Sequence, residues 1–328
     1  MDTLSESTAA HVDGKAKLET LNHFYKVHGI STDRCHEPSE KCGQTAIRAH
    51  SIPSGLVLAR LAVDGHVVMP HMKLKSPSPA EISFKRVGKN QATTFTGLCP
   101  KHDNDIFRPI DDALPDPSVP QHLFLLAYRA VFREFHACLQ NAWRFQSTYK
   151  KRVEVGLSPG TEPCNFGILA TDHLLNAYEC YEYKRQFDQF YLASDWSQLQ
   201  HYVIILKDQL PSIAVSSMFS LDDLDAPETP RVTLSVFPLH ADVIVAFSAL
   251  SNDASYVTTY LDRILSSDGC FQKHLLSKLI LQSCENFVIA PTYFDALPRE
   301  NKDAICQFFV NTIFETAKER EDERLYLF

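Results

Sequence analysis

The spacing of apolar and polar residues divides the chain into parts of different character. Residues 1–30 are polar, with a weak helical repeat over 18–28, and we expect a tail there. Residues 31–110 show short strands and loops, with predicted strands at 46–50, 67–69, 82–87 and 93–98. Residues 56–62 are ambiguous between helix and strand, and the Lys-Ser-Pro-Ser-Pro segment 75–79 is predicted to be a loop.

From residue 121 onward the pattern indicates longer elements. Residues 121–152 carry apolar side chains at spacings of three and four, which predicts a long amphipathic helix, and a second, tyrosine-rich helix is predicted over 170–190. Four apolar or alternating runs at 201–207, 213–219, 232–237 and 243–250 predict antiparallel hairpins. Helices are predicted at 254–266, 271–284 and 300–320, so the pattern favours an α+β fold with helices flanking a separate sheet.

The domain organisation follows from these patterns and from a proline-rich segment at 109–120. We expect a tail at 1–30, a first domain at 31–112, a linker with the long helix at 113–155, and a C-terminal α+β domain at 156–328. The length of 328 residues suits two domains, and a composition of 45% apolar and 22% charged residues is that of a globular protein. The tyrosines of the second helix are expected to pack in the core rather than to stack on bases.

Targeting features and cysteine usage limit the compartment. The N-terminus lacks a basic start and an apolar stretch, and no apolar run has the length of a membrane span, so we expect a cytoplasmic protein without a membrane partner. Nine cysteines without a regular framework favour reduced thiols and metal ligands over disulfides. Five of them fall on apolar faces and are predicted to be core residues: Cys138, Cys180, Cys270, Cys284 and Cys306.

The formal charge of −8 is distributed unevenly. Residues 31–110 hold 11 Lys or Arg against 7 Asp or Glu, and residues 73–101 hold six basic residues against Glu81, a local charge of +5. A basic segment in an acidic protein is suited to phosphate contacts, although lysines that only solubilise a loop would give the same pattern. The predicted nucleic-acid contacts are Lys73, Lys75, Lys85, Arg86, Lys89 and Lys101.

Two pairs of soft and imidazole donors bracket the segment Ala-His-Ser-Ile-Pro at 49–53. The pairs are Cys35-x6-Cys42 and Cys99-x2-His102. A structural zinc ion needs four such donors that converge from separate chain segments, so these four residues are the predicted zinc ligands. Buried reduced cysteines are the alternative, and the knuckle spacing of six is longer than usual.

The order of these parts, a two-cysteine knuckle, a hairpin and a helix that starts at Cys99-Pro100-Lys101-His102, resembles the HNH, or ββα-metal, nuclease family. The resemblance covers residues 35 to about 108 and implies a treble-clef zinc domain with a long insertion in its hairpin. By position, it implies that His50 is the general base, that Asp103 binds a catalytic Mg²⁺ or Mn²⁺ ion, and that Asn90 is the family's central Asn.

The chemistry of such a nuclease explains the residue types. An imidazole with an ordinary pKa of about 6.5 can accept a proton from the attacking water, and a carboxylate is a hard donor for a divalent ion. Ala49 stands where active members of the family commonly place a second ligand, so the ion would need another donor, for which His66 and Asn104 are candidates. Signatures of phosphate-binding loops, dinucleotide sites, nucleophile elbows and zinc deaminases are missing.

Three segments also resemble a bacterial protein family whose chemistry is unassigned, and this resemblance implies no reaction. The segments are His50-Ser51-Ile52-Pro53, the Gly-Leu-Cys-Pro-Lys-His-Asp run from Gly97 to Asp103 that continues to Phe107, and Cys284-Glu285-Asn286-Phe287.

Two functional hypotheses follow. The first is a metal-dependent endonuclease that cleaves DNA or RNA, with a family-level expectation of bacterial defence and a C-terminal domain that acts as a sensor, a substrate clamp or a homo-oligomer interface. The second is a non-enzymatic zinc module that binds nucleic acid or a partner protein, in which His50 packs against the zinc fold and Asp103 stabilises a helix N-terminus.

Overall fold

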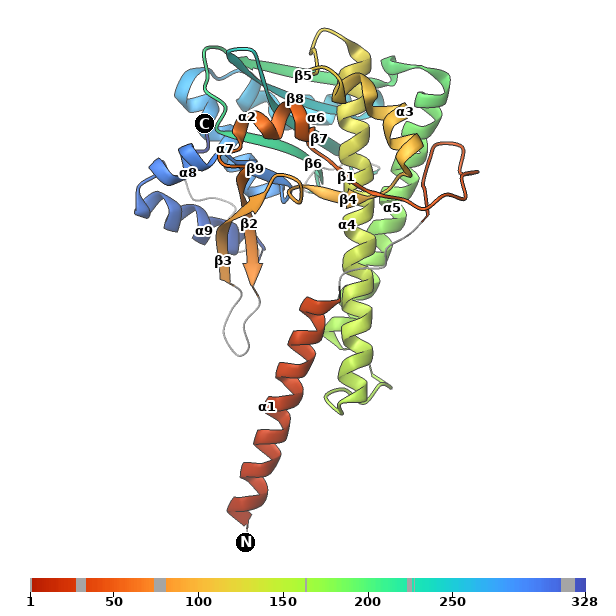
Figure 1. Ribbon diagram of the computed structural model, residues 1–328, viewed down its shortest axis with the longest axis vertical. Helices are drawn as coiled ribbons and strands as arrows, with labels where there is room; N and C mark the ends of the chain where they lie inside the picture. The colour runs from red at the N-terminus through yellow and green to blue at the C-terminus, as the bar shows by residue number, and fades with distance from the viewer. Residues whose placement is uncertain are drawn as a thin grey trace.

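A computed structural model describes residues 2–27, 34–73, 81–162, 164–222, 226, 228–313 and 322–328. The chain folds into a central antiparallel sheet flanked by helices, from which one helical arm projects (Figure 1). The expected α+β class is therefore confirmed.

The central element is a seven-stranded sheet in the order β3-β2-β9-β6-β7-β8-β5, in which every pairing is antiparallel. The four runs predicted between residues 201 and 250 are strands β5 (Leu199–Leu206), β6 (Ile213–Ser220), β7 (Arg231–Leu239) and β8 (Asp242–Leu250). Their alternating residues supply opposite faces: Ala214 and Met218 join one core cluster, and Ile213 and Val215 the other.

Three strands of this sheet come from elsewhere in the chain. Strands β2 (His66–Lys73) and β3 (Glu81–Gly88) form a hairpin. Strand β9 (Phe287–Ile289), which the spacing did not predict, pairs with both β2 and β6. The insertion expected within the first domain therefore extends the C-terminal sheet. The predicted loop at 75–79 lies outside the described residues.

The N-terminal part of the chain also forms a second, smaller sheet. Strand β1 (Arg48–His50) pairs antiparallel with β4 (Thr94–Thr96), so that Ala49 lies opposite Phe95. Helix α3 (Pro100–Asp111) follows β4 directly. The ambiguous segment is helical: a π-helical turn at Ser54–Leu58 leads into the short α2 (Ala59–Leu61).

Helices cover both faces of the large sheet. One face packs against α4 (Pro120–Glu154) and α5 (Asn165–Ala193), an antiparallel pair that matches the two predicted long helices. The other face packs against α6 (Ala254–Leu265), α7 (Gly269–Ser283) and α9 (Arg299–Ile313), while α8 (Pro291–Ala296) lies beside β2. The part of the predicted helix 300–320 beyond Ile313 lies outside the described residues.

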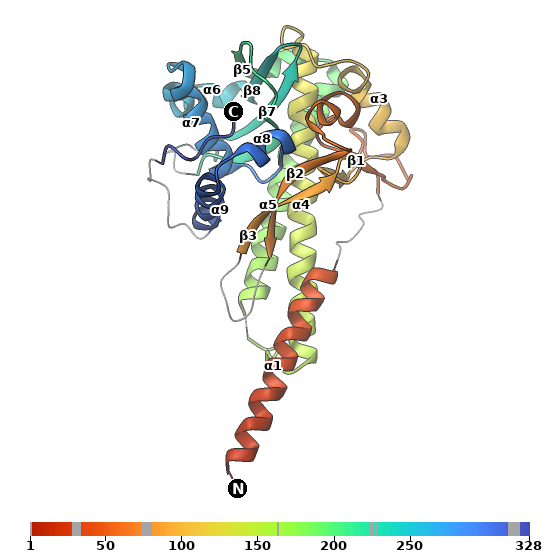
Figure 2. The ribbon, with the colours of Figure 1, turned by 60° about the vertical axis from the view of Figure 1, so that its left-hand side comes forward.

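The N-terminal tail is a longer helix than the weak repeat predicted. Helix α1 (Asp2–Lys26) projects from the body, and its C-terminal end packs beside α4 (Figures 1 and 2). Phe24 contacts Phe145 with ring centroids 5.3 Å apart, and Lys151 pairs with Glu19 at 2.7 Å. The expected tail therefore docks through its last turns.

The cysteines outside the predicted zinc site follow the prediction in part. Cys138, Cys180 and Cys284 are buried, and Cys306 is partly buried. Cys270, in contrast, is exposed, so its prediction as a core residue was wrong. It lies in the first turn of α7, and the buried residues of this helix begin at Gln272. In the described part of the chain no helix is both long and apolar enough to cross a membrane.

Candidate metal centre

Four side chains from two chain segments converge as the sequence predicted. One donor atom each from Cys35, Cys42, Cys99 and His102 lies within 4.8 Å of the other three. The Sγ atoms of Cys42 and Cys99 are 3.9 Å apart, and His102 Nδ1 lies 3.4 Å from the Sγ atoms of both Cys35 and Cys99. A tetrahedral zinc ion with ordinary bond lengths would place two sulfurs about 3.8 Å apart and sulfur about 3.5 Å from nitrogen. The four residues can therefore hold a metal ion, and their spacing fits zinc.

The two halves of the cluster are joined by backbone contacts. Pro100 occupies the first turn of α3, so Cys99 and His102 stand at its N-terminus. The loop that carries Cys35 docks beside them, because His36 N–H donates to the Gly97 carbonyl at 2.9 Å and Cys99 N–H donates to Cys35 Sγ at 3.2 Å. These contacts place the first ligand pair against the helix start.

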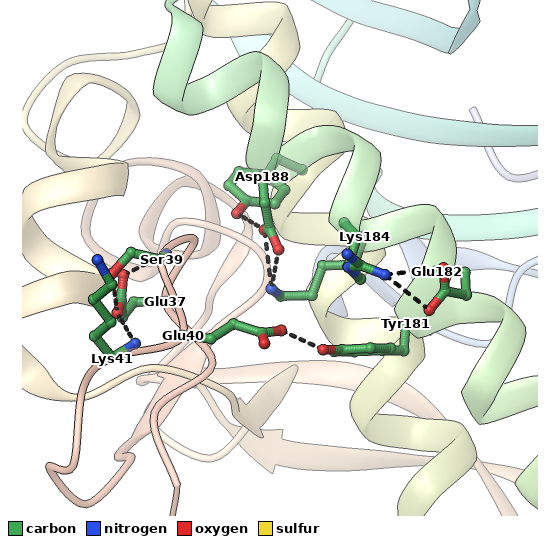
Figure 3. A network of polar contacts seen from close by, with 10 residues as sticks. Glu37, Ser39, Glu40, Lys41, Tyr181, Glu182, Lys184 and Asp188 are labelled. Carbon is green, nitrogen blue, oxygen red and sulfur yellow. Dashed lines mark hydrogen bonds and ion pairs between the residues drawn. The ribbon is translucent and has the colours of Figure 1, made fainter.

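Glu37, which the sequence analysis did not single out, organises the knuckle loop. Its buried carboxylate accepts hydrogen bonds from the N–H groups of Ser39 and Lys41, both at 2.7 Å, and from the Ser39 hydroxyl at 2.6 Å (Figure 3). The N–H group of Cys42 donates to the same carboxylate at 3.1 Å. Burial by itself would raise the pKa of Glu37, but these donors outweigh it and lower the pKa to about 2. The carboxylate thus stabilises a knuckle whose six-residue spacing is longer than usual. Its position between the candidate ligands Cys35 and Cys42 was the sequence feature that could have indicated this role.

The outer side of the knuckle loop is fixed to helix α5. Figure 3 shows Glu40 directed away from Glu37 toward Tyr181, whose hydroxyl donates to the Glu40 carboxylate. One turn further along α5, buried Lys184 donates to both oxygens of Asp188 at 2.7 and 2.9 Å. The knuckle loop is therefore tied to α5 through Glu40 and Tyr181, close to an ion pair within that helix.

The surroundings of Cys99 and Cys35 shift the pKa values of the two thiols in opposite directions. Burial acts against ionisation of Cys99, but N–H groups of His102 and Lys101 in the first turn of α3, together with the neighbouring thiols, offset it and lower its pKa. Burial raises the pKa of Cys35 to about 12. A bound metal ion would supply the positive charge that stabilises both thiolates.

His50 ends strand β1 and is half-buried. Its Nε2 atom lies 3.0 Å from the Lys89 carbonyl oxygen, an acceptor, so Nε2 carries the proton and Nδ1 keeps its lone pair. Burial lowers the pKa of His50, while the hydrogen bond to Lys89 acts in the opposite direction. The imidazole is therefore neutral near pH 7 and has one ring nitrogen able to accept a proton.

Asp103 and His50 respond to the same ion pair. Arg129, a buried residue of α4, donates to both carboxylate oxygens of Asp111 at 2.8 and 2.6 Å. Burial raises the pKa of Asp103, Arg129 lowers it and Asp111 raises it; the same two residues also act on the pKa of His50. The two predicted catalytic residues therefore share an electrostatic environment.

The other residues that the resemblance singled out, Ala49, His66 and Asn90, have separate surroundings. Ala49 is buried opposite Phe95, His66 holds the Asp64 carbonyl through Nδ1 at 2.8 Å, and Asn90 is exposed in the turn before β4. Among the described residues, the four zinc-site residues form the only group of three or more metal-binding side chains. His50, His66 and Asp103 belong to no such group there.

The predicted basic contacts are distributed over β2, β3, the turn after β3 and α3. Lys85 and Arg86 lie on β3, where Lys85 Nζ is 3.2 Å from His71 Nε2 and Arg86 pairs with Asp295 at 2.5 Å. Lys101 is exposed on α3, and Lys89 follows β3 in a turn. Lys73 ends β2, and Lys75 lies outside the described residues.

The sequence analysis also missed a buried amide that contacts Ser51, the residue after His50. Asn286 lies just before β9, and its Nδ2 atom donates to Ser51 Oγ at 2.8 Å and to the Ser216 carbonyl at 2.6 Å. The sequence offered an indication of this contact, because Ser51 and Asn286 lie in two of the segments that resemble the bacterial family, 50–53 and 284–287.

Comparison with known proteins adds no relative: no family model, no curated protein and no solved structure matches the chain.

Proposed function

We propose that the protein is a metal-dependent, HNH-like endonuclease in which a zinc-held treble clef supports His50 as general base. The contact between His50 Nε2 and the Lys89 carbonyl carries this proposal, because it selects the tautomer whose Nδ1 can accept a proton. The pairing of β1 with β4, followed directly by α3, agrees with the ββα arrangement of that family. Action in the cytoplasm, within bacterial defence, belongs to the same proposal.

The residues have distinct roles in this proposal. His50 takes the proton of the water that attacks the phosphodiester, and its lowered pKa keeps it neutral at working pH. Asp103 offers oxygen ligands to a divalent ion, Mg²⁺ or Mn²⁺, which would neutralise charge on the phosphate. The zinc ligands hold β1 and α3 in place and take no part in the reaction.

The test is cleavage of DNA and RNA by the purified protein with Mg²⁺ or Mn²⁺. His50→Ala should reduce the cleavage rate by about 10²- to 10⁴-fold while the zinc content stays unchanged. His122→Ala serves as a matched control, because His122 lies at the start of α4, where its Nδ1 caps the Asp116 N–H. Equal cleavage by wild type and His50→Ala would contradict the proposal.

The second candidate is a zinc module that binds nucleic acid without cleaving it. This candidate is favoured because, among the described residues, neither His50 nor Asp103 belongs to a group of three or more side chains that could hold a second, catalytic metal ion. It is also supported by basic residues on the β2–β3 hairpin. Neutralising Lys85, Arg86 and Lys89 together should then weaken binding and reduce its dependence on salt. Unchanged affinity and salt dependence in that variant would rule out this candidate.

A further inference from the structure

The two edges of the seven-stranded sheet are protected differently. The outer strand β3 carries Lys85 and Arg86, contacts α9, and is tied to α8 by the Arg86–Asp295 ion pair. Charges and covering elements of this kind prevent an edge strand from pairing with another chain. At the other edge, β5 reads Leu-Gln-His-Tyr-Val-Ile-Ile-Leu and contains neither a charged residue nor proline. Strand β5 therefore lacks the usual protection.

Strand β5 is held firmly in an extended form. It pairs with β8 along its whole length, and within the described residues no strand pairs with its other side. On the face toward α6, the Tyr202 hydroxyl lies 2.9 Å from the Ala254 carbonyl and 2.7 Å from Thr258 Oγ1. Because the strand is already ordered, pairing with another strand would cost little conformational entropy.

The other face of β5 exposes apolar side chains. Val203 is 37% exposed and Ile205 is 48% exposed, and Leu210, just beyond the strand, is 84% exposed. Val203 and Ile205 lie on the same side of the strand, because residues two apart share a face. An uncharged edge and an apolar strip therefore occur together.

We propose that β5 pairs antiparallel with β5 of a second copy of this chain, which joins the two sheets into one. A two-fold axis at Val203 would place Val203 opposite Val203 of the second copy and His201 opposite Ile205 of the second copy. This register keeps like faces together, packs Val203 against its equivalent and Ile205 against His201 of the second copy, and brings no charges of β5 into opposition. A second copy fits better than an unrelated peptide, because the strand is complementary to itself under this symmetry.

The first test is the mass of the protein in solution, measured by light scattering after size-exclusion chromatography. Wild type should run at twice the 37.1 kDa of one chain, and Val203→Lys and Ile205→Lys should each run as monomers. Both side chains are exposed in the monomer, so these variants should keep the wild-type circular dichroism and melting temperature. Tyr178→Lys, at a 62% exposed apolar position on α5, is the matched control and should stay dimeric.

The second test reports the register. Residues that face one another across an antiparallel pair have Cα atoms about 4.5 to 5.5 Å apart, which suits a disulfide. Val203→Cys, made in a Cys270→Ser background, should therefore form a covalent dimer under mild oxidation, whereas Tyr178→Cys should not. A monomer at the highest soluble concentration, or a dimer that survives Val203→Lys, would overturn the proposal. Neither result depends on nuclease activity.

Discussion

Asn286 donates its side-chain N–H to Ser51 Oγ at 2.8 Å, a hydrogen bond that joins residues 235 positions apart. Both residues are buried, at 3% and 1% exposure. Ser51 Oγ donates in turn to the Thr93 carbonyl at 3.0 Å, and Asn286 also reaches the Ser216 carbonyl. The segment after His50 is thereby connected to both the small β1–β4 sheet and the large sheet.

Asn286→Ala should destabilise the protein by about 1 to 3 kcal/mol, because it removes the donor that the buried Ser51 Oγ and the Ser216 carbonyl share. The free energy of unfolding from denaturant titration measures this. Asn301→Ala is the control, since Asn301 makes an exposed hydrogen bond of 3.4 Å to the Arg324 carbonyl and should cost less than about 0.5 kcal/mol. Equal stability of the two variants would contradict the role assigned to Asn286.

The metal centre predicts one zinc ion per chain in protein purified without chelator. Cys99→Ser should lose the metal and melt at a lower temperature, because the free energy of metal binding contributes to folding. Cys270→Ser, at an exposed cysteine outside the cluster, should keep the metal. Elemental analysis and thermal melting provide the two measurements. Full zinc occupancy in Cys99→Ser would argue against the assigned ligands.

Glu37→Gln should weaken zinc binding by about 10- to 100-fold although every ligand remains, because the neutral amide supports the knuckle N–H groups less well than the carboxylate. Competition with a chromophoric chelator measures this affinity. Glu40→Gln is the matched control: it changes the neighbouring carboxylate, which accepts from Tyr181 rather than from the knuckle backbone. If both variants bind zinc equally well, Glu37 does not position the knuckle.

Stability should fall as the pH decreases from about 6.5 toward 4. Burial lowers the pKa of His136 to about 4, helped by the positive charge of Arg133, and burial does the same for His201. An unfolded histidine titrates near 6.5, so the unfolded chain binds more protons in this window. The contribution of each histidine is complete above the unfolded pKa and disappears as the pH falls through the folded pKa, a change on the order of 3 kcal/mol.

Replacing His136 with Phe isolates one of these contributions. The variant removes the titrating group but keeps a ring that can contact Phe95, with which His136 makes an edge contact at 6.1 Å. The slope of unfolding free energy against pH between 4 and 6.5 should be shallower than in wild type. An unchanged slope would show that His136 titrates alike in the folded and unfolded states.

Local spacing accounts for the elements whose pattern is long. Helix α4 repeats its apolar period over many turns, and strands β5 to β8 are apolar or alternating runs of eight or nine residues. These elements and the tyrosine-rich helix α5 appear close to their predicted bounds. Strand β9 has only three residues, all buried, so no period could reveal it. Residues 54–61 are helical, but their apolar run is too short to distinguish a helix from a strand in the sequence.

The candidate site divides in the same way. Cys35, Cys42, Cys99 and His102 could be named from the sequence, because zinc chemistry restricts both the residue types and their spacing. The roles of Glu37 and Asn286 could not, since a lone carboxylate or amide has many ordinary uses. Their importance depends on which backbone groups the fold brings within hydrogen-bond distance.

The α+β class, the long elements and the four candidate metal ligands could be predicted from the sequence, because each depends on a pattern or on ligand chemistry that is local to a segment. Three relationships became visible only in the folded chain: the β2–β3 hairpin joins the C-terminal sheet through β9, the Lys89 carbonyl orients His50, and β5 forms an uncharged edge. These relationships connect distant segments, and only packing around a shared core sets their register.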